Sequence, residues 1–186
     1  MLRKSGETGF SLLEVLVVAA LSIIVTAIAV PNALNALDAY RVRSSVESIY
    51  SQIGLARMRA VGDFAHSRLV CSTSTNSCHI EVQKEGGSYQ QEGGDVYLNH
   101  GVSFGYGSAS SGAGNQSGNS PTQDLTIYFN SRGMPIDTNT PPGFVSDYVL
   151  YVQSSVYAHY YAIGISGNGK PSIYRYDTSS WTTEVN

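Results

Sequence analysis

The side chains with the most obvious chemistry are two cysteines and four histidines. Cys71 and Cys78 lie seven positions apart, with only polar residues between them. They could close a hairpin as a disulfide, remain two reduced thiols or ligate a metal, and an even cysteine count in an exported protein favours the disulfide. The histidines are scattered, and apart from the neighbours Cys78 and His79 no pair has the spacing of zinc ligands. We therefore expect no metal and no cofactor.

No motif organises the nucleophilic side chains into a catalytic site. The chain has neither a nucleophile elbow nor a phosphate-binding loop, and Gly167-Asn168-Gly169 lacks the strand-loop-helix setting of a nucleotide fingerprint. A Ser-His-Asp set can be drawn from any chain this rich in serine, so its presence carries no information. We expect that the protein is not an enzyme.

One carboxylate is unusual because of its surroundings. Residues 10–30 form an apolar run of twenty-one residues in which Glu14 is the only charge. As a helix this run would be roughly 31 Å long, enough to cross the hydrocarbon of a bilayer. An ionised carboxylate in such a helix is costly unless it has a partner. Glu14 therefore predicts an interaction with a positive group.

The segment before the apolar run favours one orientation in a membrane. Residues 1–9 are polar and carry Arg3 and Lys4, which favour the cytoplasmic side, so the chain beyond Tyr40 should be translocated. A secretory signal cleaved after Ala27-Ile28-Ala29 is the alternative. Glu14 opposes it, and so does the helical pattern that continues beyond residue 30.

The pattern after the apolar run is amphipathic. Pro31 should loosen or kink the helix, because it removes a backbone hydrogen bond and clashes with the preceding turn. Apolar residues then recur at the spacing of one helical face: Val42, Val46, Ile49, Ile53, Ala56 and Ala60. We expect residues 31–62 to continue the helix into a globular head.

Residues 63–186 have the composition of short strands and turns. Charged residues make up 13% of the chain, with 19 glycines and 13 tyrosines. Strands are predicted at 66–71, 78–83, 95–100, 102–106, 125–130, 144–153, 157–166 and 172–176. Residues 107–123 read as a flexible Gly/Ser loop. The predicted fold is α+β, a long helix packed against an antiparallel sheet.

The N-terminal sequence resembles the class III signal of type IV pilins and type II secretion pseudopilins. The string GFSLLEVLVV, residues 9–18, has the glycine, aromatic, small hydroxyl, aliphatic pair and glutamate of that signal. The resemblance implies prepilin peptidase cleavage between Gly9 and Phe10 and N-methylation of Phe10. It also implies that Glu14 sets subunit register by neutralising the amine of an incoming subunit, and that Pro31 is the family's helix-loosening proline.

The head adds a second resemblance, to the GspH/FimT-like minor pilins. It rests on three short segments, residues 56–61, 127–135 and 165–170, the last two containing glycine turns. The resemblance implies a minor subunit near the filament tip that helps to start assembly. The expected partners are other pilins or pseudopilins through helix packing, the prepilin peptidase, an inner-membrane assembly platform and, before assembly, the lipid bilayer.

The expected location follows from the same resemblance. The protein would be a single-pass component of a bacterial inner membrane with its head outside the cytoplasm, and then part of a pilus or periplasmic pseudopilus. The sequence does not separate a type IV pilus from a type II secretion system, because both use the same signal and helix.

Two alternative functions have weaker support. DNA binding is known for some FimT-like proteins with a basic tail, but here the tail is neutral to acidic and the chain's net charge is −3. Several charges are interpreted as a solvated helix face: Arg41, Arg43, Arg57, Arg59 and Arg68, with Asp38, Glu47 and Asp63. An adhesive tip is suggested by the tyrosines Tyr148, Tyr151, Tyr157, Tyr160, Tyr161, Tyr174 and Tyr176, although alternating tyrosines are also ordinary sheet packing.

Overall fold

A computed structural model describes residues 11–109, 112–113, 125–137, 143–144, 147–177 and 179–184. Within them the chain forms one helix and eleven strands. Gly9, Phe10 and most of the loop expected at 107–123 lie outside the described residues. The chain divides into two compact units, one ending at Leu37 and the other beginning at Asp38.

The helix α1 runs from Leu12 to Gly62 without a break, with Pro31 inside it. At its end, the Asp63 amide donates to the Arg59 carbonyl, and Phe64 adopts a left-handed backbone with φ of 49°. Few residues other than glycine adopt that conformation, and it cannot continue a right-handed helix. The chain therefore turns at Phe64 into the first strand.

The strands form two antiparallel sheets. The first has the order β3-β2-β1-β5-β6-β7 and the second the order β11-β10-β9-β8-β4. The strands of the first sheet are β1 Ser67–Ser72, β2 Ser77–Gln83, β3 Tyr89–Tyr97, β5 Leu125–Phe129, β6 Pro135–Asp137 and β7 Gly143–Phe144. Those of the second are β4 Val102–Phe104, β8 Asp147–Ser154, β9 Tyr160–Ser166, β10 Pro171–Asp177 and β11 Ser180–Glu184.

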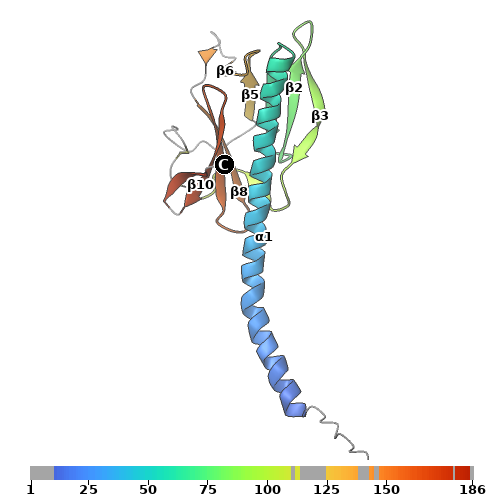
Figure 1. The fold of residues 1–186 in the computed structure, drawn as a ribbon, viewed down its shortest axis with the longest axis vertical. Coiled ribbons are helices and arrows are strands. Elements are labelled where there is room, and N and C mark those ends of the chain that lie inside the picture. Colours follow the sequence, from blue (N-terminus) through green and yellow to red (C-terminus); the bar gives the residue numbers. More distant parts are fainter. Residues whose placement is uncertain are drawn as a thin grey trace, which may run out of the picture. The chain divides into compact units, whose positions relative to one another are not determined.

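The core of the head lies between α1 and both sheets. All six α1 residues predicted to share a buried face, from Val42 to Ala60, are fully buried, which confirms the helical pattern. They pack in one cluster with residues such as Leu69 and Ile127 of the first sheet and Ile163 of the second. Figure 1 shows this part of α1 between β2 and β3 on one side and β8 and β10 on the other.

Two glycine turns fasten α1 to both sheets. Gly133 follows β5, Gly169 follows β9, and both have positive φ. A Cβ on Gly133 would lie 2.9 Å from Cγ of Arg57 and 2.9 Å from Cγ2 of Val61. A Cβ on Gly169 would lie 2.4 Å from the carbonyl oxygen of Gly133. The two turns therefore meet each other and the side chain of Arg57, at a distance that excludes larger residues.

The expected architecture is confirmed, but several strand predictions were wrong. The expected antiparallel strands are divided between two sheets. The strand predicted at 95–100 is β3, which begins at Tyr89 and ends at Tyr97. Its first half, with glutamines and two glycines, lacks the β-branched residues that signal a strand. The short strands β6 and β7 and the C-terminal β11 were not predicted.

The outer face of the second sheet carries its own small core. β9 begins at Tyr160 rather than at the predicted residue 157, and its residues Tyr161, Ile163 and Ile165 face the main core. On the opposite face, Ala162 and Tyr151 are buried in a second cluster. Partly buried aromatic residues pack against this cluster: Tyr106, Tyr174 and Trp181. Both faces of β9 are therefore covered.

Candidate functional site

The first unit exposes an apolar helix surface that nothing in the described chain covers. From residue 11 to Leu37 every described residue of α1 is exposed, including the leucines, isoleucines and valines. Its most apolar window has a mean hydropathy of 2.7, and the helix is long and apolar enough to cross a membrane. Such a surface is stable in contact with lipid or with other apolar helices.

Glu14 lies in the first turn of this helix, after the capping residue Ser11. The Glu14 amide donates to Oγ of Ser11 at 3.2 Å, and the Glu14 and Val15 amides also donate to the Ser11 carbonyl. A serine at the cap with a glutamate three residues later is the pattern of a capping box. The sequence interpretation missed this contribution of Ser11, although the Ser-x-x-Glu spacing is visible in the sequence. Glu14 also places a negative charge where the helix dipole favours one.

The surface of α1 beside Pro31 is hollowed. A shallow groove of about 530 Å³ is lined by Ser22, Ile23, Thr26, Ala27, Val30 and Pro31. The two hydroxyl groups there are bonded within the helix, since Oγ of Ser22 donates to the Val18 carbonyl and Oγ1 of Thr26 donates to the Ser22 carbonyl. Because these hydroxyls are already satisfied, they add little cost in an apolar environment.

Cys71 and Cys78 form a disulfide between β1 and β2. They are direct cross-strand partners, and both are buried in the main core. The bond closes the turn formed by Ser72 to Ser77. All thiols in the chain are thereby accounted for.

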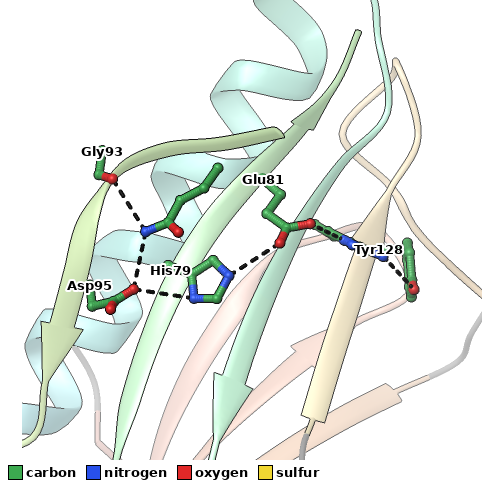
Figure 2. Close-up of polar contacts among 7 residues, drawn as sticks. His79, Glu81, Gly93, Asp95 and Tyr128 are labelled. Carbon is green, nitrogen blue, oxygen red and sulfur yellow. Dashed lines mark hydrogen bonds and ion pairs between the residues drawn. The ribbon is translucent and has the colours of Figure 1, made fainter. Parts of the chain in front are cut away.

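A polar network crosses the first sheet, as Figure 2 shows. Arg68 on β1 bonds Glu81 on β2 at 2.5 Å and Tyr128 on β5 at 3.2 Å. His79 contacts Oε1 of Glu81 through Nε2 at 3.2 Å and Oδ1 of Asp95 through Nδ1 at 3.3 Å. Together, the contacts of the network connect four neighbouring strands, in the order β5, β1, β2 and β3. Within the described residues no three His, Cys, Asp or Glu side chains form a group that could hold a metal.

The charges of this network are stabilised mutually. Burial opposes ionisation of Glu81, but hydrogen bonds from Arg68 and His79 and the charge of Arg68 outweigh it and hold the pKa of Glu81 below its ordinary value of 4.5. The guanidinium of Arg68 also lies 4.2 Å from the ring centre of Tyr89, a favourable cation–π distance. The network thus stabilises the sheet.

The interpretation of these charged residues as a solvated helix face was partly wrong. Arg68 lies on β1 rather than on the helix. Asp38 is only 4% exposed, and its Oδ2 has no hydrogen-bond partner among the described residues. Arg43 and Glu47 form an exposed ion pair within α1, as a solvated face would. Sequence spacing did not reveal the burial of Asp38, because it depends on the packing of the head.

The tyrosines considered for an adhesive tip do not form an exposed patch within the described residues. Tyr151 and Tyr161 are buried, and the other five are partly buried. Several contact each other or Trp181: Tyr160 contacts Tyr176 edge to face, and Tyr176 contacts Trp181 with the rings tilted. They mainly contribute to packing in the head.

The fold is similar to that of a solved secretion protein. It matches a structure of the minor pseudopilin EpsH from the type 2 secretion system of Vibrio cholerae with a TM-score of 0.50, at 11% identity over 72% of this chain and 95% of that chain. The chain has a pilin-like α+β fold. A second EpsH structure aligns with a TM-score of 0.47 at 13% identity, over 72% of this chain and 92% of that one.

The comparisons by sequence add nothing further, since no family model and no curated protein matches the chain. The pilin-like fold leaves Glu14 and Pro31 on the exposed helix, and it brings the cysteines together. Gly9 and Phe10 lie outside the described residues. Cleavage between Gly9 and Phe10, methylation of Phe10 and the assembly role of Glu14 therefore remain predictions.

Proposed function

We propose that this chain is a minor pilin or minor pseudopilin that assembles through its N-terminal helix into a type IV pilus or a type II secretion pseudopilus. The observation that carries the proposal is the exposed apolar helix before Asp38, joined to a head with a pilin-like fold. In a filament this surface would pack against the helices of neighbouring subunits. Before assembly it would lie in the inner membrane, with the head outside the cytoplasm.

The contacts of the head support a GspH/FimT-like role near the tip. The three segments that carry the resemblance, residues 56–61, 127–135 and 165–170, are distant in sequence. In the fold they meet, since the turns at Gly133 and Gly169 pack on Arg57. A pattern that depends on mutual packing is a more specific signal than two separate glycine turns and a helix end. We infer a subunit that helps to start assembly.

The role of Glu14 follows from the cost of burying charge. After cleavage between Gly9 and Phe10, the N-methylated amine of Phe10 would be brought among apolar helices, and the carboxylate of a neighbouring Glu14 can neutralise it. Removal of one partner from a buried ion pair typically costs about 3 to 5 kcal/mol. Membrane insertion and cleavage need no such pair.

The experiment separates this charge from the helix cap. In Glu14→Gln the side chain can still serve in the capping box but carries no charge. We expect Glu14→Gln and Glu14→Ala to be cleaved normally and to be absent from isolated filaments. Recovery is measured as the ratio of the variant in the filament fraction to that in the membrane fraction.

Two control variants complete the experiment. Ser11→Ala removes the cap and keeps the charge, and it should be incorporated. Glu47→Gln removes an exposed carboxylate of the head and should also be incorporated. Incorporation of Glu14→Gln at the level of the parent chain would contradict the proposed role of the charge.

Deletion of this protein from its host distinguishes a type IV pilus from a type II secretion system. Loss of twitching and DNA uptake would assign the protein to a type IV pilus, and loss of export of folded enzymes would assign it to type II secretion. The proposed partners are the other subunits, the prepilin peptidase and the assembly platform. The role is structural rather than catalytic.

A further inference from the structure

Phe64, just past the end of α1, combines an unfavourable backbone with an exposed ring. Its φ of 49° lies in the left-handed region, which is strained for a bulky side chain. Its side chain is 85% exposed, so burial of the ring offsets none of this strain. A glycine would suit such a helix end better. The phenylalanine therefore indicates a contact with another molecule rather than packing inside the head.

A groove of about 500 Å³ adjoins the Phe64 ring. Its sides are the end of α1 and the connection between β2 and β3, which lie together in Figure 1. The apolar lining comes from Phe64, Ala65 and Val82, and the charged lining from Asp63, Lys84 and Glu85. The groove has room for one long side chain from another molecule.

The charges around the groove favour a cation in it. The two carboxylates, Asp63 and Glu85, outnumber the single ammonium group of Lys84. None of the three forms an ion pair with another described residue. The groove also lies at the C-terminal end of α1, where the helix dipole is negative. These groups together attract a positive charge placed beside the ring.

A guanidinium fits this combination of groups better than an ammonium does. It is planar, so it can stack on an aromatic ring while the N–H groups at its edge donate to carboxylates. The head already contains one such arrangement. The guanidinium of Arg68 lies 4.2 Å from the ring centre of Tyr89 and donates to Glu81.

We propose that Asp63, Phe64 and Glu85 form a binding site, here called the Phe64 site, for an arginine side chain of a partner protein. The guanidinium stacks on the Phe64 ring, and the two carboxylates accept its hydrogen bonds. The aliphatic part of the arginine contacts the apolar lining of the groove. The partner is a protein because lipid headgroups and nucleic acids lack a guanidinium, whereas arginine is enriched in protein–protein interfaces.

The Phe64 site is separate from the surface proposed for filament assembly. Asp38 and Gly62 lie at opposite ends of the part of α1 that belongs to the head, about 36 Å apart along the helix. Packing of the apolar helix before Asp38 needs neither Phe64 nor the two carboxylates. The inference therefore goes beyond the proposed function and can fail independently of it.

Titration of the full-length chain in detergent micelles with acetyl-arginine amide tests the chemistry of the site. The amide resonances of Ala65 and Gln83, which line the groove, report binding. We expect saturable shifts with a dissociation constant on the order of 10 mM. Acetyl-citrulline amide, which has a similar shape but no charge, should bind about tenfold more weakly. Equal binding of the two probes would overturn the proposal.

Substitutions separate the contributions of the ring and the carboxylates. Asp63→Asn combined with Glu85→Gln should weaken arginine binding roughly fivefold. The matched control is Asp177→Asn, which removes an exposed carboxylate at the end of β10 and should change nothing. Phe64→Leu should weaken binding about threefold, and Phe64→Tyr should preserve it. Unchanged binding in the first variant or in Phe64→Leu would contradict the site.

Phe64→Gly distinguishes a binding role from a structural one. Glycine adopts a positive φ without strain, so this variant should unfold at a higher temperature than the parent chain while losing arginine binding. A lower unfolding midpoint would show that the ring stabilises the head, and it would overturn the proposal.

Photo-crosslinking in the host identifies the partner. p-Benzoylphenylalanine replaces Lys84 in one variant and, as a control, Val156, which is 70% exposed on the connection between β8 and β9. We expect a protein adduct at position 84 that is absent at position 156. Replacing the partner's arginine nearest the cross-link by glutamine should lower the yield roughly fivefold. An unchanged yield, or an adduct only with lipid, nucleic acid or a second copy of this chain, would overturn the proposal.

Discussion

Gly133 and Gly169 occupy positions that a larger side chain could enter only by moving its neighbours. We expect Gly169→Ala to lower the free energy of unfolding by about 2 to 4 kcal/mol, because its Cβ would lie 2.4 Å from a backbone oxygen. Gly133→Ala should cost less, about 1 to 2 kcal/mol, because its neighbours are side chains of Arg57 and Val61. Chemical denaturation measures both.

A third glycine provides the matched control. Gly54 lies in the middle of α1, and a Cβ there would meet nothing within 4 Å. Gly54→Ala should raise the stability by up to about 1 kcal/mol, the difference in helix propensity. If all three variants had the same stability, the close approach of the two turns to Arg57 would be wrong.

Glu81 gives the head a dependence on pH. Folding lowers the pKa of Glu81. Its ionised carboxylate therefore contributes fully to the stability of the head above the ordinary pKa of 4.5, and this contribution is lost as the pH falls through the lower pKa of the folded state. We expect Glu81→Gln to destabilise the head by about 1 to 2 kcal/mol at pH 7. The difference from the parent chain should shrink below pH 4.5, measured by thermal unfolding across pH.

The comparison variant is Glu47→Gln. Glu47 pairs with Arg43 on the exposed surface of α1, and such pairs contribute about 0.5 kcal/mol or less. Equal losses for the two variants at pH 7 would contradict the importance of the row of contacts around Arg68.

Which individual residues meet was only partly predictable. A disulfide between Cys71 and Cys78 was the favoured interpretation from the sequence. The hairpin that carries them was predicted from the alternating runs on either side. The row from Tyr128 to Asp95 could not be inferred, because it depends on the strand order β5-β1-β2-β3, which no local pattern encodes. The burial of Asp38 also depends on tertiary packing.

At the scale of elements, the hairpin of β1 and β2 supports a prediction about redox state. The disulfide closes a loop of eight residues, Cys71 to Cys78, and a loop of that length corresponds to about 2 to 3 kcal/mol of stabilisation. We expect reductant to lower the unfolding midpoint of the parent chain. It should leave a Cys71→Ser, Cys78→Ser double variant unaffected.

Thiol titration checks the same point directly. Protein purified without reductant should show no reactive thiol when unfolded. Two reactive thiols per chain would contradict the disulfide and leave the hairpin held by its strand pairing alone.

Elements with a strong periodic pattern were predictable and those without one were not. The six buried residues of α1 follow the helical spacing closely, because one face packs on two sheets. β3 and β11 lie at the edges of their sheets and are mostly exposed. Edge strands have no buried face to impose alternation, so their sequences are poor in the apolar residues that signal a strand.

At the scale of the whole molecule, the similarity to EpsH concerns the fold, and the proposed function depends on the apolar helix. A head of this kind could be carried by proteins with other roles, because function is determined by sites rather than by folds. The helix before Asp38 is different, since its exposed apolar surface has no use in water. The proposed filament assembly accounts for both this surface and the carboxylate at Glu14.

The most direct test is the mass of the mature N-terminus in protein purified from membranes of its own host. The account predicts a chain that begins at Phe10, with one added methyl group on its amine, and that keeps the entire apolar helix. A chain that retains residues 1–9, or one that has been cut after Ala29 and has lost the helix, would contradict it.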